Sequence, residues 1–110
     1  MDAQPGFEEL SAMVSGIARR YGIRRVILFG SRARADSGPG SDYDFCITPS
    51  EGTSVFEMGG FLADMEEEIG CKVDVVSDRN LDPGLAGRIL RDGRLLYEAR
   101  FESSDPYDAL

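Results

Sequence analysis

The feature that most constrains the fold is a short apolar run, RVILF at residues 25–29, in which hydrophobic residues do not alternate with polar ones. A strand with one solvated face would alternate, whereas a strand covered on both faces carries a continuous apolar run. Strands of this kind are typical of sheets covered by helices. The run therefore predicts an inner strand of an α/β domain.

Helical patterns stand on either side of this run. Apolar residues recur every three or four positions from Phe7 to Tyr21, which predicts a helix that Gly22 ends. The sequence SVFE at 54–57 is a capping box, which predicts the start of a second long helix. Its expected apolar stripe is Val55, Met58, Leu62, Met65 and Ile69. Two glycines in that helix, Gly59 and Gly60, suggest close packing against the sheet.

The remaining segments complete an alternation of helices and strands. Strands are predicted at 42–48, 72–77 and 94–98, the last at an edge of the sheet, and a brief helix at 31–36. Another helix is predicted from the Asp82–Pro83 cap to Gly93. This order indicates an α/β fold in one domain over 1–99, followed by a loose acidic tail at 100–110.

Composition excludes several classes of function. The net charge of −8 argues against direct binding of nucleic acid, and no apolar run approaches the ~20 residues of a membrane span. The chain has no histidine, which leaves carboxylates as the expected chemical groups. Cys46 and Cys71 lie in apolar segments without metal-ligand spacing, so we expect buried thiols of a cytoplasmic protein rather than a disulfide.

The stretch GSRARADSGPGSDYDF, residues 30–45, carries the first candidate site. A strand that ends at Gly30–Ser31 and turns into a helix exposes backbone N–H groups that favour an anion. The glycine lets a phosphate approach closely, and the Ser31 hydroxyl is available to bond a phosphate oxygen. The alternative is an ordinary strand-to-helix turn in which the serine caps the helix.

Three aspartates form the second candidate site. Asp42 and Asp44 are two residues apart, so on a strand they project from the same face. Adjacent carboxylates and phosphates suit magnesium, although a solvated polar strand entrance is the alternative. Asp74 is an isolated charge in an apolar strand that we expect to be buried. It either joins the other two acids in a two-metal site or forms a salt bridge, for example with Arg25.

Together these residues resemble a known family. Gly30–Ser31, ten further residues, Asp42–Tyr43–Asp44 and a later strand aspartate are similar to the nucleotidyltransferase superfamily related to DNA polymerase beta. The branch that the chain resembles is the minimal nucleotidyltransferases, or MNT proteins, and the likeness covers about residues 23–98. It implies a polymerase beta-like fold with a mixed sheet of about four strands.

The resemblance also implies roles for individual residues. Two magnesium ions and the catalytic step would depend on Asp42, Asp44 and Asp74, the last of which helps to deprotonate an acceptor hydroxyl. Contacts with the nucleoside triphosphate, usually ATP, are assigned to Gly30, Ser31, Arg34 and Ser41. Arg32 is a second phosphate candidate, but Arg34 is favoured because it falls in the family's Gly-Ser-x-Ala-Arg pattern. Either arginine is otherwise a solvent-exposed side chain.

The resemblance further implies a partner. MNT proteins act as antitoxins of HEPN proteins, which are helical RNases, and some transfer AMP from ATP to a tyrosine of that toxin. The chain has little beyond the core, so we expect a partner protein or a second copy of the chain to complete the site. The alternatives are an antitoxin that acts by contact alone and a small-molecule nucleotidyltransferase that works as a homo-oligomer.

Overall fold

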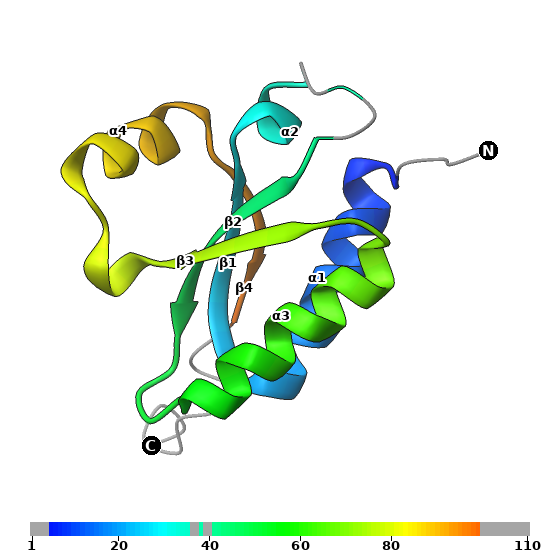
Figure 1. Ribbon diagram of the computed structural model, residues 1–110, viewed down its shortest axis with the longest axis vertical. Helices are drawn as coiled ribbons and strands as arrows, with labels where there is room; N and C mark the ends of the chain where they lie inside the picture. Colours follow the sequence, from blue (N-terminus) through cyan, green and yellow to red (C-terminus); the bar gives the residue numbers. More distant parts are fainter. Residues whose placement is uncertain (1–4, 36–37, 39–40, 100–110) are drawn as a thin grey trace, which may run out of the picture.

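The computed structural model describes residues 5–35, 38 and 41–99, so the acidic tail predicted at 100–110 lies outside the described residues. Helices and strands alternate along this part of the chain (Figure 1). The helices are α1 (Phe7–Tyr21), α2 (Ser31–Arg34), α3 (Val55–Ile69) and α4 (Pro83–Asp92), with a 3₁₀ turn, η1, at Asp78–Asn80. The strands are β1 (Ile23–Phe29), β2 (Tyr43–Pro49), β3 (Val73–Ser77) and β4 (Arg94–Glu98).

The four strands form one mixed sheet in the order β3-β2-β1-β4. β1 is antiparallel to both β2 and β4, whereas β2 and β3 are parallel and are connected through α3. The expected α/β fold with a mixed four-stranded sheet is therefore confirmed. β1 is an inner strand and β4 an edge strand, as their sequences predicted.

Three predicted helix boundaries are confirmed, and each depends on local sequence, whereas the brief helix predicted at 31–36 ends at Arg34. α1 ends at Gly22, which adopts the left-handed conformation at φ 71°. The capping box at the start of α3 is complete, since the Ser54 hydroxyl accepts from the Glu57 N–H and the Glu57 carboxylate accepts from the Ser54 N–H. The Asp82 carboxylate caps α4 by accepting from the N–H groups of Gly84 and Leu85.

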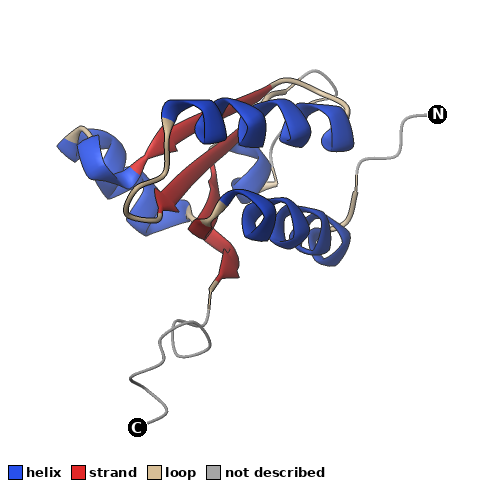
Figure 2. Ribbon diagram, turned by 90° about the horizontal axis from the view of Figure 1, so that it is seen from below, coloured by secondary structure: helices blue, strands red, loops and turns tan. Residues whose placement is uncertain are grey.

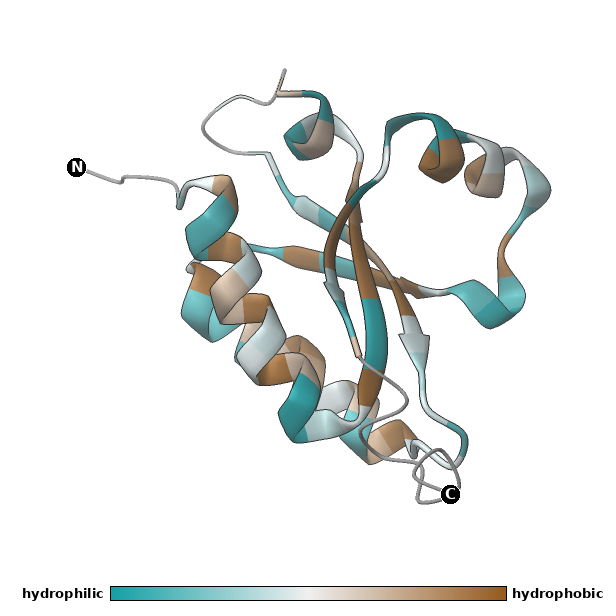
Figure 3. Ribbon diagram, turned by 180° about the vertical axis from the view of Figure 1, so that it is seen from behind, coloured by the Kyte–Doolittle hydropathy of each residue, from teal (hydrophilic) through white to brown (hydrophobic). Residues whose placement is uncertain are grey.

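The two long helices cover one face of the sheet. α1 and α3 lie side by side there, as Figure 1 and Figure 2 both show. Bands of hydrophobic and hydrophilic residues alternate along both helices (Figure 3), and their apolar sides meet the strands. The largest fully buried side chains are Val14, Ile17, Ile23, Val26, Phe45, Ile47, Phe61 and Met65. This layer is the main hydrophobic core.

Two details of α3 differ from the predicted stripe. Val55 is 85% exposed, while Phe61, outside the expected stripe, is completely buried. Gly60 packs against α1 rather than the sheet, because a Cβ on it would lie 2.7 Å from the Tyr21 ring. A Cβ on Gly59 would point into open space among the described residues. The reason is that α3 is buried against both α1 and the sheet, which shifts its inward side toward Phe61.

The other face of the sheet is covered only in part. α4 approaches β1, since a Cβ on Gly93 would lie 2.7 Å from Cγ2 of Ile27. β3 is an edge strand, and Asp74 on it is exposed, so the prediction that this aspartate lies on a buried strand is wrong. Cys46 is buried and Cys71 half-buried, and both are free thiols. Among the described residues no helix has the length and hydrophobicity needed to span a bilayer.

Candidate active site

The turn between β1 and α2 has the geometry that its sequence suggested. Gly30 adopts φ 80° and ψ −160°, a conformation that residues with a side chain rarely adopt, and its carbonyl accepts from the N–H groups of Ala33 and Arg34. Gly30 itself is the N-cap of α2. Ser31 is the first helical residue, so the alternative in which the serine caps the helix is wrong.

Asp44 lies directly beside this glycine. β1 and β2 pair so that Phe29 is opposite Asp44, and a Cβ on Gly30 would lie 2.5 Å from the Asp44 Oδ2 atom. No other residue type fits there without moving the carboxylate. The glycine therefore has a second role besides its conformation, because it admits the acid to the turn.

The three aspartates predicted to gather are neighbours. In the parallel pairing of β2 with β3, Asp44 is the direct partner of Asp74, and neighbouring strands lie only about 4.8 Å apart. The pKa of the Asp44 carboxyl is raised chiefly by burial and then by the charges of Asp74 and Asp42. The expected proximity of Asp74 to the acidic pair is confirmed.

The alternative of a salt bridge between Asp74 and Arg25 is not found. Arg25 instead contacts Asp78 at 3.5 Å and Glu98 at 3.9 Å. Within residues 5–35, 38 and 41–99, no salt bridge involves Asp74. A cluster of carboxylates without a cation is electrostatically unfavourable, which favours a role in binding one.

The donor set suits a hard divalent cation. All three candidate ligands offer carboxylate oxygens, the ligands that magnesium prefers, and a cation would relieve the repulsion that raises the pKa of Asp44. In the described part of the chain, however, no group of three histidine, cysteine, aspartate or glutamate side chains is arranged so that it could hold a metal ion. Magnesium binding by these aspartates therefore stays a prediction. Substrate phosphates commonly supply the remaining ligands of magnesium.

A hollow of about 340 Å³ opens beside the turn and Asp44. The sequence singled out four of its lining residues, namely Gly30, Ser31, Arg34 and Asp44. Three others come from α4 and were missed, namely Leu85, Arg88 and Asp92. Their spacing of three and four residues could have shown that they share one side of α4. It could not have shown that this side faces the active site.

The two candidate arginines point to different places. Arg34 lines the hollow, and its Nη1 atom lies 3.7 Å from Oδ2 of Asp92. Arg32 instead donates to the Ser41 carbonyl at 2.7 Å and stacks on the Tyr43 ring at 4.4 Å. The preference for Arg34 over Arg32 is supported, because Arg32 ties the loop before β2 to α2.

Ser41 has a local role in the same loop. Its hydroxyl accepts from the Gly38 N–H at 2.9 Å, and it is not among the residues that line the hollow. Its predicted contact with the nucleotide stays a prediction.

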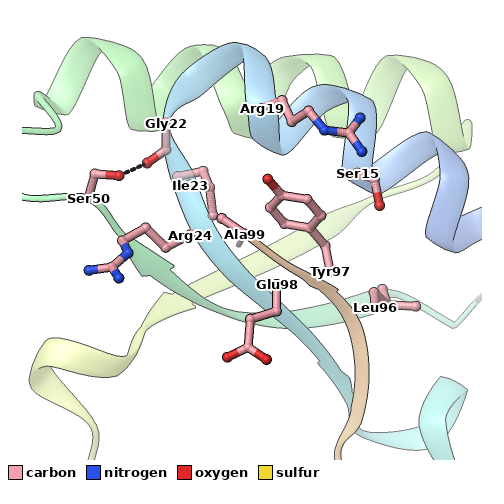
Figure 4. A pocket seen from close by; sticks show the side chains of 10 residues that line it. All are labelled: Ser15, Arg19, Gly22, Ile23, Arg24, Ser50, Leu96, Tyr97, Glu98 and Ala99. Atoms are coloured by element: carbon pink, nitrogen blue, oxygen red, sulfur yellow. Dashed lines mark hydrogen bonds between the residues drawn. The ribbon is translucent and has the colours of Figure 1, made fainter. Parts of the chain in front are cut away.

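A larger hollow of about 600 Å³ lies elsewhere, beside the last turn of α1 and the ends of β1 and β4 (Figure 4). Arg19 stacks on the Tyr97 ring there at 5.6 Å, and Arg24 and Glu98 lie nearby. None of the predicted site residues lines it. Size alone does not locate an active site, and the smaller hollow is the one lined by Asp44 and the glycine turn.

Comparisons with known proteins show the family of this chain. The family model described as polymerase beta, nucleotidyltransferase matches residues 13–102. A protein of Methanocaldococcus jannaschii assigned as a protein adenylyltransferase is 31% identical over 84 residues, which cover 76% of this chain and 90% of that protein. The protein adenylyltransferase MntA of Thermococcus cleftensis is 29% identical over 83 residues, covering 76% of this chain and 84% of the relative.

Solved structures have the same fold. One that is assigned as a minimal nucleotidyltransferase has a TM-score of 0.70 and 30% identity, covering 84% of this chain and 98% of that one. A Shewanella oneidensis MNT antitoxin in complex with a tri-AMPylated HEPN toxin has a TM-score of 0.66 at 14% identity, covering 89% of this chain and 77% of that one. The family match spans most of the sequence and includes the glycine turn and all three aspartates. The chain therefore belongs to the polymerase beta nucleotidyltransferase family.

Proposed function

We propose that this nucleotidyltransferase moves AMP from ATP to a tyrosine hydroxyl of a HEPN-type toxin and thereby acts as its antitoxin. Two lines of support are the relatives named protein adenylyltransferase and the fold shared with an MNT antitoxin bound to an AMPylated HEPN toxin. One observation on this chain carries the proposal: the Asp44 carboxylate lies against the Gly30 turn while its register partner is Asp74.

The residues of the turn hold the triphosphate in this proposal. Gly30 leaves room for a phosphate, the Ser31 hydroxyl donates to a phosphate oxygen, and the Arg34 guanidinium offers a planar pair of donors. Ser41 is retained as a proposed contact on the loop before β2. Positioning of this kind is most of the catalysis in phosphoryl transfer, since the protein does little covalent work itself.

The three aspartates supply the chemistry. Asp42, Asp44 and Asp74 would hold two magnesium ions, which when bound balance the charge of the phosphates and polarise them. Asp74 accepts the proton of the acceptor hydroxyl, whose oxygen forms a bond to the α-phosphorus as the bond to pyrophosphate breaks. The exposure of Asp74 on an edge strand leaves room for that acceptor to approach.

The acceptor side of the proposal depends on a partner. The active-site face of the sheet is only partly covered, so a second protein has access to Asp74. The net charge of −8 favours a partner with a basic surface, because complementary charge speeds the encounter. We place the reaction in the cytoplasm, where thiols such as those of Cys46 and Cys71 stay reduced.

The decisive experiment incubates the purified protein with labelled ATP, magnesium and a HEPN-type protein. We expect label on the HEPN protein, a mass increase of one AMP per modified tyrosine, and loss of both with Asp74→Ala. A HEPN protein that stays unmodified yet is still inhibited by the Asp74→Ala protein would establish a contact-only antitoxin. Label on a small alcohol or antibiotic instead would establish a small-molecule transferase.

A further inference from the structure

One wall of the active-site hollow belongs to α4, and it carries charge. Leu85, Arg88 and Asp92 line the hollow from successive turns on one side of the helix. Asp92 is already engaged, because its carboxylate lies 3.7 Å from the Arg34 guanidinium. Arg88 is exposed and, among the described residues, has no salt bridge. The α4 wall thus presents one engaged anion and one unengaged cation.

The charges of the hollow are balanced without a ligand. Asp44 and Asp92 contribute two negative charges, and Arg34 and Arg88 contribute two positive ones. A triphosphate would add several negative charges next to Asp44, so it needs cationic partners from the protein as well as metal ions. Arg34 can turn to the phosphates only by giving up part of its interaction with Asp92. Arg88 needs no such exchange.

We propose that Arg88 is a phosphate-binding residue of the nucleotide site and that Asp92 competes with the phosphates for Arg34. The inference rests on the proposed function, since it requires a nucleoside triphosphate in this hollow. The guanidinium of Arg88 binds phosphate oxygens with its planar pair of N–H donors. Asp92 holds Arg34 at the edge of the hollow, and this ion pair weakens nucleotide binding because it occupies the Arg34 guanidinium.

The neighbouring arginine provides a matched control. Arg91 is on the same helix, is also exposed and carries the same charge, but it does not line the hollow. Arg88→Gln and Arg91→Gln change the net charge equally and remove side chains of the same size. Only the position relative to the hollow differs between the two variants.

The first test measures the affinities of the full chain for ATP, AMP and adenosine by calorimetry in magnesium buffer. We expect Arg88→Gln to weaken ATP binding about tenfold or more, the usual size of a lost hydrogen bond to a charged group. Adenosine binding should not change, and Arg88→Lys should restore part of the ATP affinity. Arg91→Gln should stay within about twofold of the wild type for all three ligands, because exposed charges away from the ligand contribute little.

The second test examines the competition between Asp92 and the phosphates. Asp92→Asn should tighten ATP binding a few-fold in the wild-type background. The same substitution should have no effect when combined with Arg34→Gln, because the interaction that it removes is already absent. Additive effects of the two substitutions would overturn the competition between Asp92 and the phosphates.

The outcomes separate this inference from the proposed function. If the wild type binds ATP and Arg88→Gln binds it equally well, the role of Arg88 is overturned while the proposed function stands. The same holds if Arg88→Gln weakens ATP and adenosine alike, or if Arg91→Gln has an equal effect. A wild-type protein that binds no ATP would overturn both. Circular dichroism and thermal unfolding of each variant confirm that a lost affinity does not come from lost folding.

Discussion

Alternate side chains of β2 enter two different environments. Tyr43, Phe45 and Ile47 face α1 and α3 and are buried in the core. On the opposite face Asp44 and Thr48 are half-buried, and Cys46 between them is buried. A single strand therefore stabilises the fold with one set of residues and forms the candidate site with the other. Substitutions on the two faces should have opposite consequences, so the comparison can be tested residue by residue.

The largest effect on AMP transfer should come from Asp42 and Asp44, the aspartates on the face of the sheet that α1 and α3 do not cover. Asp44→Asn or Asp42→Asn should reduce AMP transfer by about a thousandfold or more, because a neutral amide cannot balance a divalent cation and the phosphates. The fold should be kept. Transfer of labelled AMP and a thermal unfolding curve, recorded on the same preparations, check both parts. Unchanged binding of magnesium–ATP by both variants would contradict the assignment of these aspartates.

The largest effect on stability should come from the next residue along the strand. Phe45 is fully buried, so Phe45→Ala should lower the free energy of unfolding by about 3–5 kcal/mol through lost burial and a cavity. Urea unfolding measures this loss in the free energy of unfolding. At a temperature where the variant is still folded, transfer should remain close to the wild-type rate. A folded but inactive Phe45→Ala protein would show that the two faces of β2 are not independent.

Substitution of Gly30 should have a smaller effect on both AMP transfer and stability. Gly30→Ala places a Cβ 2.5 Å from Asp44 Oδ2 and forces a positive φ on a residue with a side chain. Backbone strain of this kind costs of the order of 1–3 kcal/mol. Displacement of the Asp44 carboxylate should also weaken ATP binding and transfer. Calorimetry and thermal unfolding test the two consequences.

Gly60→Ala is the control on the helix-covered face. Its Cβ would lie 2.7 Å from the Tyr21 ring, so it also crowds a side chain, but one that is remote from the aspartates. It should alter stability by no more than about 1 kcal/mol, since better helix propensity offsets the contact, and leave transfer unchanged. Equal losses of activity in both variants would mean that crowding, rather than position, decides the outcome.

The smallest effect concerns the pH dependence of stability. Burial, followed by the charges of Asp74 and Asp42, raises the pKa of Asp44 above its ordinary 3.8. The native state then holds the proton more tightly than the unfolded chain, so stability falls as pH rises between the two pKa values, and the loss is complete above the higher one. Asp44→Asn removes this loss.

Asp44→Asn should therefore raise the melting temperature at pH 7. The gain should shrink as the pH falls through the raised pKa and vanish below about 3.8, where the wild-type carboxyl is protonated in both states. Thermal unfolding of the two proteins between pH 3 and pH 8 measures the difference. A gain that is the same at every pH would contradict ionisation of Asp44 as its source.

Local sequence is enough to predict the features that depend on neighbouring residues. Local conformation and hydrogen bonding set the end of α1 at Gly22 and the starts of α3 and α4 at Ser54 and Asp82. They also set the glycine turn at Gly30 and place Asp42 and Asp44 on one side of a strand. These are interactions over a few positions, so composition and spacing are enough to predict them.

Tertiary packing decided the rest. Only the register of β2 with β3 makes Asp74 the partner of Asp44, and only the pairing of β1 with β2 brings Asp44 against Gly30. A shift of one residue in either register would turn the acids toward the core, and no local pattern specifies it. The same holds for α4, whose Arg88 enters the active-site hollow because of how the helix packs on the sheet.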